Sequence, residues 1–120
     1  MKILFDQGTP VPLRRVLRGH LVSTVYEQGW ATLADGALLV AAERDGFEVF
    51  VTTDQQLKYQ QQLAGRRLAI LVLGTTSWPR IEPHAETIGQ VIADLVAGAY
   101  REFPILGPVF SNERPDPGVE

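Results

Sequence analysis

The sequence lacks cysteine and long apolar runs, and it has no segment typical of a secreted or membrane protein. Without cysteine, disulfide bonds and thiolate metal ligands are excluded, which agrees with a reducing compartment. The apolar run 68–73 is much shorter than the roughly 20 residues that cross a bilayer. The N-terminal run 2–5 is too short for a signal peptide and ends at an acid, Asp6. We therefore expect a soluble, cytoplasmic protein without membrane contact.

Two stretches of the chain lack acidic residues, although the formal net charge is −3. Their basic residues are Arg14, Arg15 and Arg18 in residues 7–26, and Lys58, Arg66, Arg67 and Arg80 in residues 55–81. Solvated helix faces explain such runs as well as a local positive potential does. The second explanation suits a polyanionic substrate, because the two stretches directly follow Asp6 and Asp54.

Histidine pairs and nucleotide-binding motifs are also missing. The two histidines, His20 and His84, stand apart, and neither has a partner at the spacing of metal ligands. No glycine-rich phosphate loop, dinucleotide fingerprint or serine–histidine pairing is present. We therefore expect both histidines to be structural or exposed.

The apolar pattern predicts strands that alternate with helices in one domain of residues 1–106. Predicted strands cover residues 2–5, 20–25, 47–53, 68–73 and 100–106, and predicted helices cover 10–19, 35–46, 55–64 and 83–96. Residues 26–34 and 74–82 are predicted loops, the first with a largely buried Trp30. This alternation implies right-handed crossovers, a mostly parallel sheet and a three-layer α/β/α fold. Residues 107–120 have linker composition and are predicted to form a flexible tail.

Aspartates directly follow two of the predicted strands. Asp6 ends the first strand and Asp54 the third, and ligands bind parallel α/β sheets beyond the carboxyl ends of the strands. Asp35 begins a predicted helix, either as a plain N-cap or as a third acid of the same site. Turn formation is the alternative role for the other two. Because like charges repel, a shared site would suit Mg²⁺ or Mn²⁺, which prefer oxygen ligands.

Hydroxyl and amide side chains flank these strand ends. Thr52 and Thr53 precede Asp54, and Gln7 and Gln55 follow the two strand-end aspartates. All four can hydrogen-bond carboxylates or metal-bound water. β-propensity of the threonines and solvent exposure of the glutamines explain the same residues equally well.

A phospho-receiver domain also has acids after its first and third strands. Thr75 or Thr76 could supply the hydroxyl residue that this fold carries after its fourth strand. The receiver fold also needs a lysine after its fifth strand, and no lysine follows Lys58. This alternative is therefore the weaker one.

Three segments together resemble a family of short bacterial PIN-like proteins, namely 2–7 (KILFDQ), 33–39 (LADGALL) and 51–55 (VTTDQ). Segments 57–61 (LKYQQ) and 63–67 (LAGRR) are similar to one branch of it. The resemblance covers residues 1–105 and implies a three-layer α/β/α fold with a Mg²⁺- or Mn²⁺-dependent nuclease site, commonly for single-stranded RNA. It implies that Asp6, Asp35 and Asp54 are the catalytic and metal-binding residues. Many relatives are toxins of toxin–antitoxin pairs, so an antitoxin is an implied partner.

The leading prediction is a metal-dependent endoribonuclease of PIN-like fold. We expect three basic residues, Arg14, Lys58 and Arg80, to contact the phosphate backbone. Trp78 would stack a base if it is exposed on its loop, but a core or lid role is the more common one.

The alternative prediction is an interaction module that kept the fold and lost catalysis. Two departures from the family favour it. Ala37 stands where close relatives often carry glutamate, and no acid directly follows Leu73, where many PIN nucleases have one. Both interpretations allow a homodimer.

Overall fold

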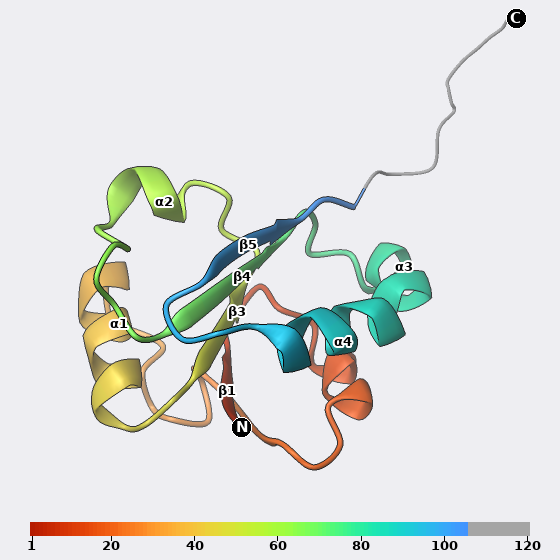
Figure 1. The fold of residues 1–120 in the computed structure, drawn as a ribbon, viewed down its shortest axis with the longest axis horizontal. Helices are drawn as coiled ribbons and strands as arrows, with labels where there is room; N and C mark the ends of the chain where they lie inside the picture. Colours follow the sequence, from red (N-terminus) through yellow and green to blue (C-terminus); the bar gives the residue numbers. More distant parts are fainter. Residues whose placement is uncertain (106–120) are drawn as a thin grey trace, which may run out of the picture.

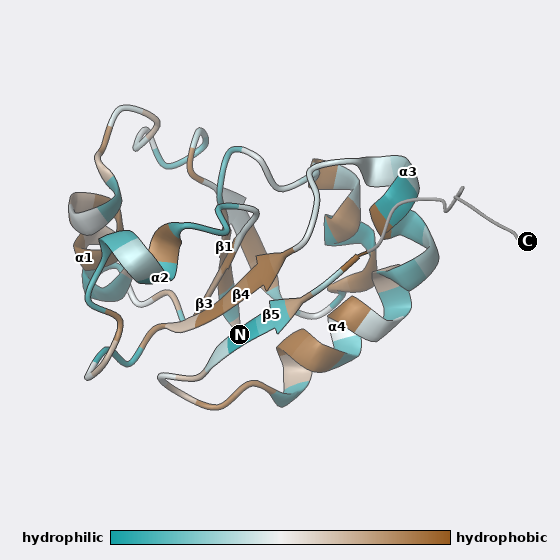
Figure 2. Cartoon of the chain, turned by 90° about the horizontal axis from the view of Figure 1, so that it is seen from above, coloured by the Kyte–Doolittle hydropathy of each residue, from teal (hydrophilic) through white to brown (hydrophobic). Residues whose placement is uncertain are grey.

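The computed structural model describes residues 1–105, which form one five-stranded sheet between two layers of helices (Figures 1 and 2). The strands are β1 (Lys2–Phe5), β2 (Leu21–Thr24), β3 (Val49–Thr52), β4 (Ala69–Leu73) and β5 (Tyr100–Phe103). Every neighbouring pair is parallel, in the order β2-β1-β3-β4-β5. The predicted three-layer α/β/α fold with a mostly parallel sheet is therefore confirmed.

The helices cover both faces of the sheet. One layer, at the right in Figure 1, contains η1 (Val11–Val16), α3 (Trp78–Ile81), η2 (Glu82–His84) and α4 (Ala85–Asp94). The other layer contains α1 (Asp35–Arg44) and α2 (Leu57–Gln60). Buried side chains of β1, β3 and β4 alternate between the two faces. The first core contains Ile3, Phe5, Val49, Val51, Leu71, Leu13, Ile88 and Ile92, and the second contains Leu4, Phe50, Ile70, Val72, Leu38, Leu39 and Leu57.

The helices differ most from their predicted bounds. The predicted helix 10–19 is a six-residue 3₁₀ helix, in which Pro12 has no N–H to donate. The predicted helix 55–64 is only α2, because its polar sequence buries a single side chain, Leu57. The predicted loop 74–82 contains α3. The last α-helix ends at Asp94, so Val96 lies beyond the apolar stripe and is 70% exposed.

Two predictions about the ends and loops need comment. The prediction of a largely buried Trp30 is wrong, because the side chain is only partly buried at the margin of the second core, where its ring packs edge-to-face on Phe47 with centroids 5.9 Å apart. β5 ends at Phe103, whereas Leu106 and the predicted tail 107–120 lie outside the described residues. No helix within residues 1–105 is long and apolar enough to cross a membrane.

Candidate functional site

Asp6 and Asp54 lie at the carboxyl ends of neighbouring strands, as predicted. In β1 and β3, Phe5 pairs with Val51, and the Asp6 N–H donates to the Val51 carbonyl at 2.9 Å. The chain first adds β2 on one side of β1 and then adds β3, β4 and β5 on the other side. The gap between β1 and β3 is thus the topological switch point, where doubly wound sheets bind ligands.

The Thr52 hydroxyl connects the two aspartates. It donates to Asp6 Oδ2 at 2.7 Å and accepts the Asp54 N–H at 3.1 Å, and Thr52 is fully buried. The predicted contact between a strand-end threonine and a carboxylate is therefore confirmed for Thr52. Asp6 Oδ1 accepts the Gln7 N–H at 2.9 Å. Since a carboxylate has about four acceptor positions, Asp6 keeps capacity for a further ligand.

Asp54 also forms the turn that the alternative role predicted. Its Oδ1 accepts the Gln56 N–H at 2.9 Å, and its carbonyl accepts the Leu57 N–H at 3.3 Å. Within residues 1–105, Oδ2 of Asp54 accepts no hydrogen bond. A turn role therefore leaves one oxygen of this carboxylate available.

Gly8 and Thr9 pack the loop after Asp6 against the end of β3. A Cβ atom on Gly8 would lie 2.3 Å from Thr53 Oγ1, so a larger residue would require the Thr53 side chain or the loop to shift. Thr9 is 3% exposed, and its hydroxyl donates to the Val51 carbonyl at 2.8 Å. Sequence reasoning missed both residues, although the glycine two positions after Asp6 was a usable signal of close backbone approach.

Asp35 is the first residue of α1 and not its N-cap, which corrects the plain capping role. The N-cap is Ala34, and no side chain caps this helix. Burial raises the pKa of Asp35, and the negative charges of Asp54 and Asp6 raise it further. The Asp35 carboxyl group therefore shares an electrostatic environment with the two strand-end aspartates.

Within residues 1–105, no lysine or arginine forms an ion pair with any of the three aspartates. Four ion pairs lie within residues 1–105: Lys2–Asp45, Arg14–Glu27, Lys58–Glu102 and Arg66–Glu43. None of them includes Asp6, Asp35 or Asp54. A site neutralised by internal lysine or arginine would have favoured the interaction module, and this part of the chain has no such pairing.

Asp6 and Asp54 are the two carboxylates at this edge that could hold a divalent cation. Within residues 1–105, no three histidine, cysteine or carboxylate side chains are grouped closely enough to hold one ion. Mg²⁺ typically keeps several waters and uses only one or two carboxylates. Asp6 and Asp54 provide two, and Asp35 adds negative potential.

The predicted phosphate contacts have different surroundings. Arg14 donates to Glu27 at 2.9 Å, and Lys58 donates to Glu102 at 2.8 Å, so both charges are already paired. Arg80 in α3 is exposed and has no ion pair within the described residues. Trp78 is partly buried and packs against the first core, as expected for a core role rather than for base stacking.

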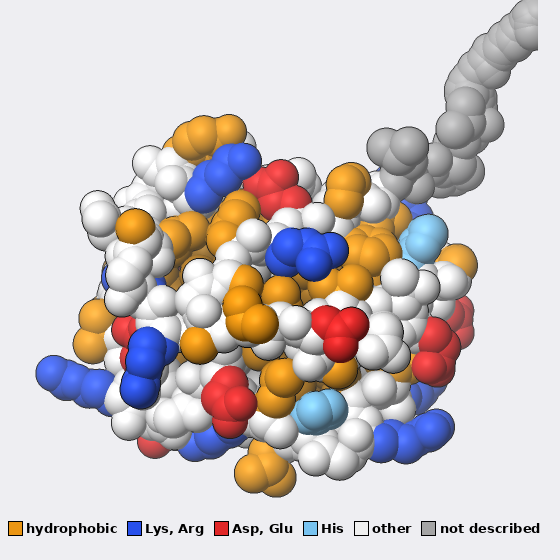
Figure 3. Space-filling model, viewed as in Figure 1, with side chains coloured by type: hydrophobic (Ala, Val, Ile, Leu, Met, Phe, Trp, Pro, Cys, Tyr) orange, Lys and Arg blue, Asp and Glu red, His pale blue; other side chains and the backbone are white. Residues whose placement is uncertain are grey.

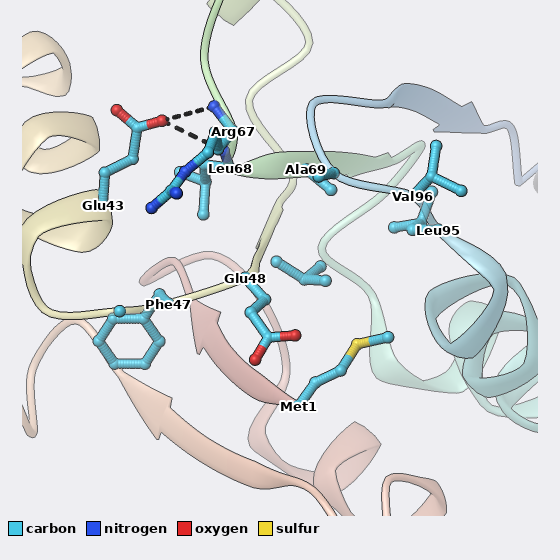
Figure 4. Close-up of a pocket in the computed structure, with 12 residues that line it drawn as sticks. Met1, Glu43, Phe47, Glu48, Arg67, Leu68, Ala69, Leu95 and Val96 are labelled. Atoms are coloured by element: carbon cyan, nitrogen blue, oxygen red, sulfur yellow. Dashed lines mark hydrogen bonds between the residues drawn. The ribbon is translucent and has the colours of Figure 1, made fainter.

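A separate cavity of about 340 Å³ lies at the opposite, amino edge of the sheet (Figure 4). Its apolar lining includes Met1, Phe47 and Val96. Glu43 at its margin accepts backbone N–H groups of residues 67 and 68 at 2.9 and 3.2 Å. The cavity contains none of the three aspartates, so it is not part of the candidate site.

Comparison with known proteins adds no relative to this description. No protein-family model, curated protein or solved structure matches the chain. The PIN-like assignment therefore stays a prediction from the sequence motifs, and the geometry of the carboxyl edge is the basis of the functional conclusion.

Proposed function

We propose that this chain is a metal-dependent endoribonuclease of PIN-like fold whose active site consists of Asp6, Asp35 and Asp54. One observation carries the proposal: within residues 1–105 these three acids share the carboxyl edge and have no ion-pair partner, whereas four other acids, Glu27, Glu43, Asp45 and Glu102, are ion-paired. Uncompensated negative charge at a ligand-binding edge favours a divalent cation and, through it, a phosphate substrate.

The residues of the proposed site have different roles in phosphodiester hydrolysis. A bound Mg²⁺ or Mn²⁺ ion would lower the pKa of water and offset charge on the phosphate. Asp6 and Asp54 would hold this cation, and the Thr52 hydroxyl orients the Asp6 carboxylate by donating to it. Asp35, whose pKa is raised, orients the attacking water by accepting its hydrogen bond and can receive a proton at its carboxylate.

The biological setting follows from the resemblance alone. A toxin of a toxin–antitoxin pair acting on cytoplasmic RNA is the role that the PIN-like motifs imply. An antitoxin partner and a homodimer are parts of the same proposal.

The rival proposal, a non-catalytic interaction module, has one observation in its favour. No acid lies in residues 74–81, which directly follow β4, and the Gln55 side chain donates to the Gly74 carbonyl there at 3.2 Å. The acidic site is therefore limited to the β1–β3 side of the edge. The receiver alternative shares this strand order, but its phosphoryl-binding lysine has no counterpart after Lys58.

Cleavage of a mixed RNA pool in Mn²⁺ tests the proposal. We expect the wild type to cleave and Asp54→Asn to lose at least about 100-fold in rate, because the substitution removes charge needed in the transition state. Asp45→Asn is the matched control, since Asp45 pairs with Lys2 at the opposite edge. Equal cleavage by both variants, or no Mn²⁺-dependent cleavage by the wild type, would support the interaction module.

A further inference from the structure

Tyr59 presents an exposed aromatic ring on α2, the helix that follows Asp54 in the chain. The side chain is 72% exposed, and the residue lies in α2, which begins three residues after Asp54. The Gln56 and Leu57 N–H groups both bond to Asp54, so the first turn of α2 is fixed to this aspartate. Tyr59 lies in this anchored helix, five residues after Asp54.

Lys58 lies close to the ring and is held in place by β5. Its Nζ is 5.1 Å from the ring centroid of Tyr59 and 5.9 Å from that of Tyr100. Nζ donates to Glu102 Oε2 at 2.8 Å, and the Tyr100 hydroxyl donates to the same oxygen at 2.8 Å. Figure 3 shows basic, acidic and apolar side chains side by side over α2 and β5. The network keeps the ammonium group beside the Tyr59 ring.

The protonation states of this network are stable near neutral pH. The hydrogen bond from Lys58 lowers the pKa of Glu102, and the same bond raises the pKa of Lys58. Burial and the bond to Glu102 raise the pKa of Tyr100 to about 12. Because Lys58 is already paired, it is better placed to support the neighbouring ring than to neutralise a phosphate.

The surroundings of Tyr59 indicate what kind of partner the ring fits. Protein and membrane interfaces use contiguous apolar patches of several hundred Å². Around Tyr59 the neighbours in sequence are polar and exposed, namely Gln56, Lys58 and Gln60. A single flat ring with amide groups nearby instead suits a nucleobase, which has an aromatic face and hydrogen-bonding edges.

We propose that Tyr59 is a stacking platform for a base of single-stranded nucleic acid, with Lys58 as its support. The proposal rests on the proposed nuclease function, because it places a phosphate of the same strand at the aspartate edge. A duplex is a poorer ligand, since its bases are already stacked on one another. Stacking of one base on an aromatic side chain typically strengthens binding about 5- to 150-fold.

Binding of labelled 12-mer oligonucleotides to the full chain tests this inference. Single-stranded RNA and DNA are titrated in Ca²⁺ and in EDTA, and the integrity of each oligonucleotide is checked afterwards. We expect Tyr59→Leu to weaken single-strand binding about 10-fold. Tyr59→Phe keeps the ring and should bind within about twofold of the wild type. The fluorescence of a 2-aminopurine base in the strand should be quenched on binding to the wild type and to Tyr59→Phe, but not on binding to Tyr59→Leu.

Two control ligands separate stacking from general weakening. A duplex of the same sequence and an abasic strand offer no free base, so Tyr59→Leu should change neither affinity. Equal binding by wild type and Tyr59→Leu, equal losses for all ligands, or no single-strand binding by the wild type would overturn the inference. Ring-dependent binding without any Mn²⁺-dependent cleavage would keep the platform and remove the nuclease proposal.

Discussion

The acidic side chains at the two edges of the sheet have different partners. At the amino edge, Lys2 pairs with Asp45 at 3.0 Å, and Glu43 binds Arg66 at 3.4 Å as well as two backbone N–H groups. At the carboxyl edge, the hydrogen bonds to aspartate side chains come from neutral donors, namely the Thr52 hydroxyl and the N–H groups of Gln7 and Gln56. Asp45 and Glu43 at the amino edge are thus ion-paired, whereas within residues 1–105 Asp6, Asp35 and Asp54 have no ion pair.

The largest expected effect of this difference is a response to metal at the carboxyl edge. An ion that binds only the folded state stabilises it by about 2.7 kcal/mol at a hundredfold excess over its dissociation constant. We expect Mn²⁺ to raise the melting temperature of the wild type and of Asp45→Asn, but not of Asp6→Asn. The measurement is thermal unfolding with and without Mn²⁺ at fixed protein concentration and ionic strength. An unchanged wild-type melting temperature in millimolar Mn²⁺ would mean that both edges are only structural.

The second effect concerns the stability of the amino edge. Glu43→Ala removes the acceptor for two backbone N–H groups and the partner of Arg66. Leaving such donors unpaired costs about 1–3 kcal/mol of unfolding free energy, which urea denaturation measures. Glu48→Ala is the control, because Glu48 is exposed on the same edge and should change stability by less than about 0.5 kcal/mol. The Mn²⁺ response of Glu43→Ala should stay intact, and its loss would show that the edges are coupled.

The sequence predicted the fold and the position of the two strand-end aspartates because both depend on local patterns. An apolar run followed by an acid marks the end of a buried strand, as at Asp6 and Asp54, and parallel strands end at the same edge. Thr52 was predictable for the same reason, since it lies two residues before Asp54 and its hydroxyl bonds to the backbone there.

Ion pairs between residues far apart in the chain could not be predicted from the sequence. Lys58 looks like a free cation in an acid-free stretch, but Glu102 reaches it from β5, 44 residues away. Arg14 is likewise paired with Glu27, 13 residues away. The capping role of Asp35 was wrong because composition does not separate an N-cap from the first helical residue, and a shift of one position decides between them.

The smallest effect is the pH dependence of Asp35, which tests whether the three acids share one environment. The pKa of Asp35 in the folded protein is raised above its ordinary value of 3.8, by burial and then by Asp54 and Asp6. The folded state therefore holds this proton more tightly than the unfolded chain does. Linkage then requires that stability falls as the pH rises from 3.8 through the raised pKa, because the carboxylate ionises less favourably in the folded state.

Asp35→Asn removes this ionisation, so it should stabilise the metal-free protein at pH 7 and lose that advantage below pH 3.8. The gain is about 0.5 kcal/mol, since solvent screens a partly exposed group. A carboxylate in the first turn of a helix also gains roughly 0.3–1 kcal/mol from the helix dipole, which opposes the effect. Urea denaturation of both proteins at pH 3 and pH 7 decides between the two. If Asp35→Asn is less stable at pH 7 and equal at pH 3, the dipole dominates, and Asp35 stabilises its helix more than it is repelled by the other two aspartates.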